Sequence, residues 1–306
     1  MDVPELLNPT DFAIPGFVAL VLVELAFVRL TNRDDFEARD TTASLMMGVG
    51  NVASDVFFGF IGVGILTGIW TLAEQHLGWQ GLGWLGFSWP VFVLCFVLDD
   101  LRYYWWHRLA HVSRWFWGSH VVHHSSQHYN LSTALRQPWN GHFTGSVLLK
   151  LPLIFMGFHP VVIAFCASLN LVYQFWIHTE HIRRLPAPIE FIFNTPSHHR
   201  GHHGSNIRYL DCNFAGTLII WDRMFGTFVQ EDDADPPRYG LVYNIGTFNP
   251  IRIAFHEWVS LARDATQPGL TLLERLQYIF APPGYSHDGS RKTAAMMKAE
   301  QARLEA

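Results

Sequence analysis

The chain has 306 residues, of which 49% are hydrophobic and only 15% are charged, with 12 Trp and 24 Phe. This composition is unusually apolar for a soluble protein of this length, and a formal net charge of -5 provides no basic surface for nucleic acid. The three cysteines, Cys95, Cys166 and Cys212, form no CxxC pair, so neither a disulfide framework nor a zinc ribbon is predicted.

Long apolar runs dominate the first third of the chain and return further on. Three runs, over residues 14–30, 56–73 and 82–98, precede the first histidine cluster. Each would form a helix of about 25 Å, near the short limit of what crosses a bilayer. Two more runs, over residues 143–158 and 161–177, could span the membrane or enter it as a re-entrant hairpin. The sequence therefore predicts about four or five membrane-embedded helices.

The distribution of positive charge predicts the orientation of these helices. All 21 Lys and Arg residues lie at or after Arg29, and none lies in the connections at 74–81 or 157–160. Because loops rich in Lys and Arg stay on the cytoplasmic side, three spans before His107 would place the loop at 31–50 and every histidine cluster there. The short N-terminus would face outward. We expect a multi-pass protein of the bacterial inner membrane or an equivalent membrane.

Histidines are concentrated between His107 and His203, where 14 of the chain's 17 occur, in the strings HRLAH, HVVHH, HTEH and HHRGHH. Residues three and four apart share one face of a helix, and Pro196 can begin a helix that carries the last string. The imidazoles predicted to share a direction are those of His107, His111, His120, His123, His124, His199, His202 and His203. We interpret six others as ordinary surface or core residues: His76, His128, His142, His181, His256 and His287.

Eight clustered imidazoles exceed the roughly four ligands of one zinc ion and suit two metal ions. Haem is a poorer interpretation, because it takes only one or two histidines. Imidazole binds iron, copper, nickel and zinc, so spacing alone leaves the element open. Asp100 lies seven residues before His107 and would share its helix face, which makes it a candidate to accept an imidazole N–H, although an ordinary cap or surface charge is equally compatible. Glu180 and Asp211 are the other carboxylates that could offset the metal charge.

This histidine order on an apolar chain resembles the fatty acid hydroxylase / sterol desaturase superfamily. Longer strings resemble its alkylglycerol monooxygenase group: YYWWHRLAH at 103–111, HHSSQHYNLSTALRQ at 123–137, YQFWIHTEH at 173–181, NTPSHHRGHHG at 194–204 and LIIWDRMFGTF at 218–228. The resemblance implies a membrane di-iron monooxygenase that uses O2 on a lipid, with those eight histidines and His178 as ligands. It also implies that a tetrahydropterin, or an external electron donor such as a redox partner, supplies electrons. The chain departs from that group at Val112, where the group has Glu, and at residues 125–128, where SSQH replaces SSED.

We therefore expect an all-α integral membrane helical bundle with a cytosolic helical cap that holds a histidine-rich dimetal site. The expected regions are transmembrane helices over 1–98, the histidine domain over 99–248, and an amphipathic segment and tail over 249–306. The alternative function is a zinc-dependent membrane hydrolase acting on a lipid or peptide, but the chain has no HExxH. A metal transporter is disfavoured, because only Glu24 and Asp55 lie in or beside the first two apolar runs.

Overall fold

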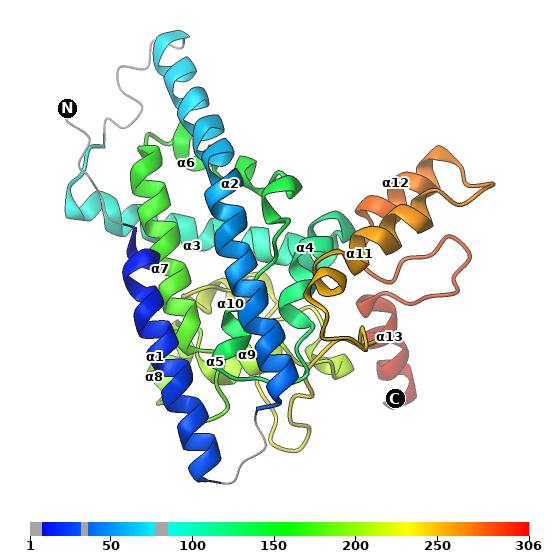
Figure 1. Cartoon of the computed structure of the whole chain (residues 1–306). Helices are drawn as coiled ribbons and strands as arrows, with labels where there is room; N and C mark the ends of the chain where they lie inside the picture. The colour runs from blue at the N-terminus through cyan, green and yellow to red at the C-terminus, as the bar shows by residue number, and fades with distance from the viewer. Residues whose placement is uncertain (1–7, 32–35, 77–84, 306) are drawn as a thin grey trace.

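The computed structural model describes residues 8–31, 36–76 and 85–305, and these residues form helices and loops without any strand (Figure 1). An antiparallel bridge between Gly204 and Tyr239 is isolated. The all-α prediction is therefore confirmed for this part of the chain. The start of the third predicted run, at 82–84, and most of the connection at 74–81 lie outside the described residues.

The longer helices are α1 (Pro9–Leu30), α2 (Ala38–His76), α3 (Trp89–Val112), α4 (Arg114–His124), α7 (Pro160–Trp176), α11 (Pro250–Ala265) and α13 (Ala294–Glu305). The shorter helices are α5 (Leu131–Ala134), α6 (Leu151–Phe155), α8 (Ala187–Ile192), α9 (Pro196–His202), α10 (Ile220–Phe225) and α12 (Leu272–Phe280). Single 3-10 segments are η1 (Gly141–Thr144), η2 (Ser146–Lys150) and η3 (Ile207–Tyr209). Of the predicted elements, α9 does begin at Pro196.

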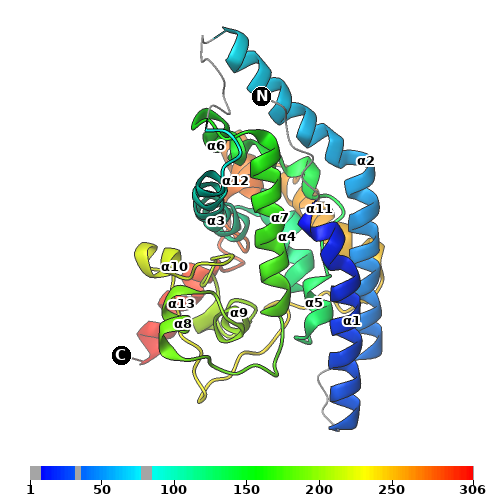
Figure 2. The same cartoon turned by 90° about the vertical axis from the view of Figure 1, so that its left-hand side faces the viewer.

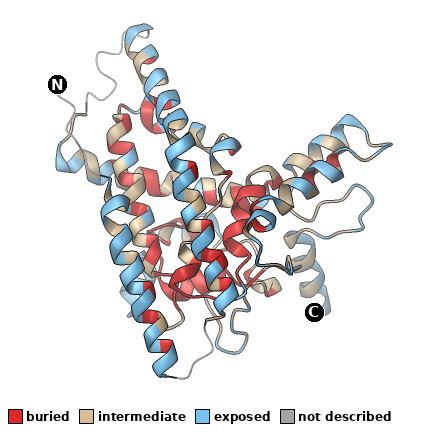
Figure 3. Ribbon diagram, in the orientation of Figure 1, coloured by how far each residue is buried: buried red, intermediate tan, exposed pale blue. Residues whose placement is uncertain are grey.

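Helices α1 and α2 direct their apolar side chains outward. Both are long and apolar enough to cross a membrane, and only 17% and 11% of their most apolar stretches are buried. Pale blue, exposed ribbon runs along both helices in Figure 3. The core helix of a soluble protein would bury such side chains, whereas lipid can surround them. Length, composition and exposure together indicate membrane association.

Helix α2 extends well beyond the span predicted at 56–73. It begins at Ala38, so much of the loop predicted at 31–50 is helical. Its 39 residues would reach roughly 58 Å, about twice the thickness of the hydrocarbon core. The first turns are held by protein contacts, because Asp40, Ser44 and Met47 are buried. This end of α2 thus packs against the histidine domain.

Helix α3, which contains most of the third predicted run, does not lie parallel to α1 and α2. It runs across α1, α2 and α7 in Figure 1 and is seen nearly end-on in Figure 2, where those three helices stand upright. It is unbroken from Trp89 to Val112 and packs on α7 and α4, with Cys95, Asp99 and Tyr104 buried. Protein contacts therefore set its direction, and α1 and α2 are the membrane-capable helices of the described chain.

The apolar run predicted at 143–158 is not one helix. It is divided among η1, η2 and α6, and Gly145 between the first two has a left-handed φ of 78°, a conformation that favours glycine. The indole Nε1 of Trp115 donates to the carbonyl oxygen of Thr144 at 3.0 Å, which ties this bend to α4. The run predicted at 161–177 does form one helix, α7, which packs against α1 and α3.

Candidate metal centre

Four segments bring the predicted imidazoles together. Helix α3 carries His107 and His111 on one face, and α4 carries the HVVHH group at its C-terminal end. Helix α9 carries His199 and His202, with His203 as its C-cap. His178 directly follows α7. The helical spacing places the imidazoles of each segment on one face, and the four segments pack with these faces toward one another.

The nine imidazoles form two buried groups. One contains His107, His111, His120, His124 and His202, and the other contains His123, His178, His199 and His203. Within each group the candidate ligand atoms lie within 4.8 Å of one another. Metal–nitrogen bonds of about 2 Å place the ligands of one ion at most about 4 Å apart, so each group is close to the size that one ion requires. The groups adjoin, since the ring centroids of His124 and His203 are 4.4 Å apart.

Backbone carbonyls fix the protonation of several of these rings. A carbonyl oxygen can only accept, so a ring nitrogen that bonds to one must carry the hydrogen, and the other nitrogen of the neutral ring keeps a bare lone pair. Four rings are held in this way through Nδ1: His107 by Phe214 at 2.7 Å, His202 by Cys212 at 2.8 Å, His178 by Gln174 at 2.8 Å and His123 by Arg136 at 3.3 Å. Their Nε2 atoms are therefore acceptors.

These acceptor atoms face one another. The Nε2 atoms of His123 and His178 are 3.2 Å apart, and neither has a hydrogen to share. The Nε2 atoms of His111, His202 and His203 are buried without a hydrogen-bond partner. Burial lowers the pKa of His123 and His202 to about 3 and that of His178 to about 4, so protons do not occupy these positions near neutral pH. A metal cation is the partner that such a donor set fits.

Two buried carboxylates hold the loop at 212–218, which supplies two of the four carbonyls, those of Cys212 and Phe214. Asp100 accepts from the backbone N–H groups of Thr217 and Leu218 at 2.8 and 2.9 Å, and also from Trp221 and Asn170. Asp222, on α10, accepts from Phe214 and Ala215 at 2.7 and 2.8 Å. The prediction that Asp100 accepts an imidazole N–H is wrong, because the carbonyl oxygen of Phe214 accepts from His107 instead. Asp100 holds the loop that contains this carbonyl.

The other two predicted carboxylates lie at the edge of the centre. Asp211 is 3.5 Å from Nδ1 of His111, and burial raises its pKa to about 6. Glu180 accepts a hydrogen bond from the hydroxyl of Tyr239, whose ring stacks on Tyr129 at 4.9 Å between centroids. Asp211 can therefore orient a ring directly, whereas Glu180 acts on the wall of the site.

Residues of α1 and α2 for which the sequence predicted no role also contact the segments that carry the clustered histidines. Asp40 on α2 binds the guanidinium of Arg136 at 3.0 Å, and both side chains are buried. Arg136 is the residue whose carbonyl accepts from His123. Glu24 on α1 accepts from the backbone of Leu131 at 2.7 Å and from the hydroxyl of Thr179 at 2.6 Å. Two sequence features could have indicated these contacts. They are the string ALRQ, which contains Arg136, and Glu24, the lone acidic residue of the first apolar run.

The remaining histidines lie outside the two groups, and several of them have ordinary partners. His142 pairs with Asp55 at 2.7 Å, and His198 pairs with Glu190 at 2.9 Å. His159 caps the start of α7. His198 shares its helix with three of the clustered rings but points away from them, because its Nε2 is bound by Glu190 on α8.

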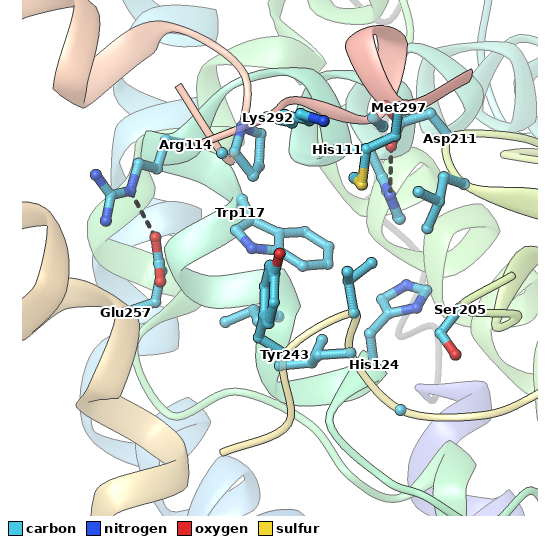
Figure 4. A pocket seen from close by; sticks show the side chains of 18 of the residues that line it. His111, Arg114, Trp117, His124, Ser205, Asp211, Tyr243, Glu257, Lys292 and Met297 are labelled. Carbon is cyan, nitrogen blue, oxygen red and sulfur yellow. Dashed lines mark hydrogen bonds and ion pairs between the residues drawn. The ribbon is translucent and has the colours of Figure 1, made fainter. Parts of the chain in front are cut away.

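Two hollows approach the first group from different sides. A pocket of about 660 Å³ reaches His111, His124, His202 and His203, and its outer walls come from α11 and the segment before α13 (Figure 4). A second, apolar groove of about 440 Å³ follows α3 from Leu98 to Leu109 and is closed on the other side by η2 and α6. Trp106 lines this groove, and its ring lies 5.9 Å from that of His107 and 5.7 Å from that of His120.

Residues 92–227 match the family model described as fatty acid hydroxylase. This part of the chain is a fatty acid hydroxylase domain. It begins within α3, ends just after α10 and includes all nine clustered imidazoles. The resemblance predicted from the histidine strings is therefore confirmed at the level of the superfamily.

Relatives of known name are similar over more of the chain than this domain. Alkylglycerol monooxygenase from Homo sapiens is 39% identical over 276 residues, 89% of this chain and 59% of that protein. The enzyme of that name from Danio rerio is 40% identical over 256 residues, 83% of this chain and 54% of that protein. Ornithine lipid hydroxylase OlsE from Rhizobium tropici is 27% identical over 180 residues, 58% of this chain and 53% of that protein. The chain spans less than two thirds of each, and no solved structure matches it.

Proposed function

We propose that this protein is a membrane-bound, non-haem di-iron monooxygenase that hydroxylates a lipid with O2. The observation that carries the proposal is the pair of buried groups made only of imidazoles, with bare Nε2 atoms directed inward. The group of five imidazoles and the group of four imidazoles would each hold one iron ion. Iron bound there would supply the activation of O2 that attack on an unactivated C–H bond requires.

The composition of the groups disfavours the alternative of a zinc hydrolase. Hydrolysis on zinc uses a carboxylate or comparable base beside the metal-bound water. Among the described residues, neither group includes an Asp or Glu, and the nearby Asp211 contacts the outer nitrogen of His111. The neutral imidazole shell instead suits a centre whose charge changes during redox chemistry.

The chain's own residues would bring the substrate to this centre. The groove along α3 is lined mainly by Leu, Trp, Pro and Met side chains, which suits an alkyl chain. Exposed Leu148, Phe155 and Met156 lie on the neighbouring η2 and α6, so this side would face lipid. Trp106 stands between the groove and the first imidazole group, and we expect it to decide how far a chain enters.

A cytoplasmic position of the site has a local basis. Arg29 and Arg39 flank the connection between α1 and α2, and positively charged connections stay on the cytoplasmic side. Asp40, next to this connection, bonds to Ser126 and Arg136 beside His123. The histidine centre would therefore lie on the cytoplasmic side of a bacterial inner membrane or an equivalent membrane.

The similarity to alkylglycerol monooxygenases makes an ether lipid the first substrate to test. Hydroxylation of the carbon beside the ether oxygen would give a hemiacetal, which separates into an aldehyde and an alcohol. One oxygen atom of O2 would enter the lipid and the other would leave as water, with two electrons from a tetrahydropterin or a redox partner and two protons from the donor or the solvent. An acyl chain or sterol would stop at the alcohol.

The test is to load purified protein with iron and supply alkylglycerols, sterols and acyl lipids separately, each with and without a tetrahydropterin. We expect about two iron ions per chain, O2 consumption and a hydroxylated or cleaved lipid by mass spectrometry. His123→Ala should lose the iron of its own group, O2 consumption and the lipid product. Iron well below two equivalents with no O2 uptake would refute the proposal. Lipid cleavage that continues under argon would identify a hydrolase instead.

A further inference from the structure

Helices α11 and α12 form a hairpin at the periphery of the molecule, outside the fatty acid hydroxylase domain (Figure 1). One face of α11 is held by Arg114 of α4, a buried side chain that donates to Glu257 at 2.6 Å, to Ser260 at 3.0 Å and to Asp264 at 2.7 Å. These three acceptors lie three, four and seven residues apart, so they share a face. The clamp fixes the rotation of α11 and holds its opposite face outward.

That outward face is apolar on α11, and α12 presents a similar one. On α11 the exposed side chains are Ile251 at 63%, Phe255 at 42% and Val259 at 55%; on α12 they are Leu272 at 73%, Leu273 at 65%, Leu276 at 43% and Phe280 at 54%. Single exposed apolar residues are ordinary, but a contiguous set marks an interaction surface.

Hydrogen bonds at the turn fix the two helices of the hairpin relative to each other. The guanidinium of Arg275 on α12 donates to the carbonyl oxygens of Ala265 and Gln267, at 2.6 and 3.1 Å, and so covers the C-terminal end of α11. Thr271 and Glu274 form a capping box at the start of α12. Both helix ends at the turn are therefore satisfied, and the exposed apolar faces are held in place.

Two observations favour lipid as the occupant of this surface. Ile253 and Ala254 of α11 share a buried cluster with Ala43 and Met47 of α2, so the exposed face of α11 begins beside a membrane-capable helix whose side chains are also exposed. Arg252 and Arg263 are exposed beside the apolar stripe. Basic residues beside an apolar stripe are typical of helices that lie in the plane of a membrane surface.

We propose that the α11–α12 hairpin is an interfacial anchor whose seven apolar side chains enter the boundary between headgroups and acyl chains. Such helices bury their apolar face about 5–10 Å deep. The inner face of α11 contributes His256, Glu257 and Ser260 to the pocket that reaches the imidazoles. The hairpin would thus place the mouth of this pocket at the bilayer surface. Delivery of a lipid there rests on the proposed function, but the anchoring does not.

The test uses cysteine labelling in lipid nanodiscs, since Cys95, Cys166 and Cys212 are buried. An environment-sensitive fluorophore is attached to Phe255→Cys or to Leu276→Cys, both exposed positions whose substitution should leave the fold intact. Asp233→Cys, in a loop where the side chain is 89% exposed, is the aqueous reference, and Phe57→Cys on α2 is the lipid reference. Quenching by nitroxide-bearing lipid is compared with quenching by iodide.

We expect the labels at 255 and 276 to lose most of their emission to nitroxide lipid, as at 57, and to resist iodide. The label at 233 should show the reverse. Iodide quenching at either 255 or 276 as strong as at 233 would overturn the proposal. Protection from both quenchers would also overturn it, because it would mean that protein covers the hairpin. The readout needs neither bound iron nor turnover, so it fails or succeeds independently of the proposed function.

Discussion

At the scale of single residues, the site depends on which ring nitrogen carries the hydrogen. The four carbonyls that bind Nδ1 leave Nε2 free as an acceptor, and buried acceptors without donors destabilise a protein unless a cation joins them. We therefore expect that a metal ion bound by these rings would stabilise the folded protein. Two predictions test this at individual positions.

We expect His123→Ala and His202→Ala each to remove most of the bound metal from its own group and to abolish turnover, because each deletes an inward-facing ligand. Membrane insertion should persist, since α1 and α2 contain neither residue. Metal per chain by mass spectrometry and O2 uptake are the measurements. His76→Ala, at an exposed position, is the matched control and should retain both. Near wild-type activity in either cluster variant would show that the cluster is not the site.

Gly216 tests the loop that supplies the carbonyls. A Cβ atom at this position would lie 2.5 Å from Oδ1 of Asn170 and 2.9 Å from Oδ1 of Asp100, so Gly216→Ala should push the loop away from Asp100. Loss of such supporting contacts typically weakens metal binding about 10- to 100-fold. Metal titration measures the effect. Gly226→Ala is not a suitable control, because the left-handed φ of 71° at Gly226 would strain an alanine. Gly59→Ala, with nothing near the added atom, should bind metal as the wild type does. Equal affinity for both variants would mean that the loop does not orient the ligands.

At the scale of elements, spacing predicted the helices that carry the histidines but not how those helices are arranged. HxxxH and HxxHH require a helix to put their rings on one face, so α4 and α9 could be read from the chain. The direction of α3 could not, because it depends on packing with α7 and α4. Likewise, the carbonyls of Cys212 and Phe214 are backbone groups that no sequence motif displays. Asp100 was predicted to accept an imidazole N–H, but it accepts from Thr217, Leu218, Trp221 and Asn170.

The contact between α2 and the site provides a prediction at this scale. Asp40→Asn would leave the buried guanidinium of Arg136 without its counter-charge, which typically costs about 3–5 kcal/mol. Thermal unfolding in detergent should therefore shift strongly to lower temperature. Asp232→Asn removes an exposed partner of Arg208, and such exposed pairs contribute little to stability. A similar shift in unfolding temperature in both variants would indicate that the buried contact between Asp40 and Arg136 stabilises the protein no more than an exposed ion pair.

At the scale of the whole molecule, the apolar composition predicted the membrane helices, and exposure in the structure supports the two that are α1 and α2. The number of spans was harder to predict, because an apolar run such as 82–98 or 143–158 can be buried by protein as well as by lipid. The division into regions 1–98, 99–248 and 249–306 stays a prediction. The site lies where α1, α2 and the histidine domain meet, through Glu24, Asp40 and Arg136.

Acidification tests the centre as one unit. In the folded protein, burial lowers the pKa of His123, His178 and His202 to about 3, 4 and 3, whereas an unfolded histidine has a pKa near 6.5. Below about pH 6.5 these three histidines therefore bind protons in the unfolded chain but not in the folded chain. The free energy of unfolding should therefore fall as the pH drops from 6.5 toward 4. Metal ligation requires the same neutral rings.

We therefore expect bound metal, O2 uptake and the unfolding temperature to decline together over this range. Metal analysis after rapid desalting at each pH gives the first quantity, and a shift back to pH 7 with added iron should restore activity wherever the fold has survived. An inactive sample at pH 5 that still holds its full metal would contradict the link between the neutral imidazoles and the metal. A loss of metal at pH 5 without any loss of stability would show that the vacant groups tolerate protons, contrary to their burial.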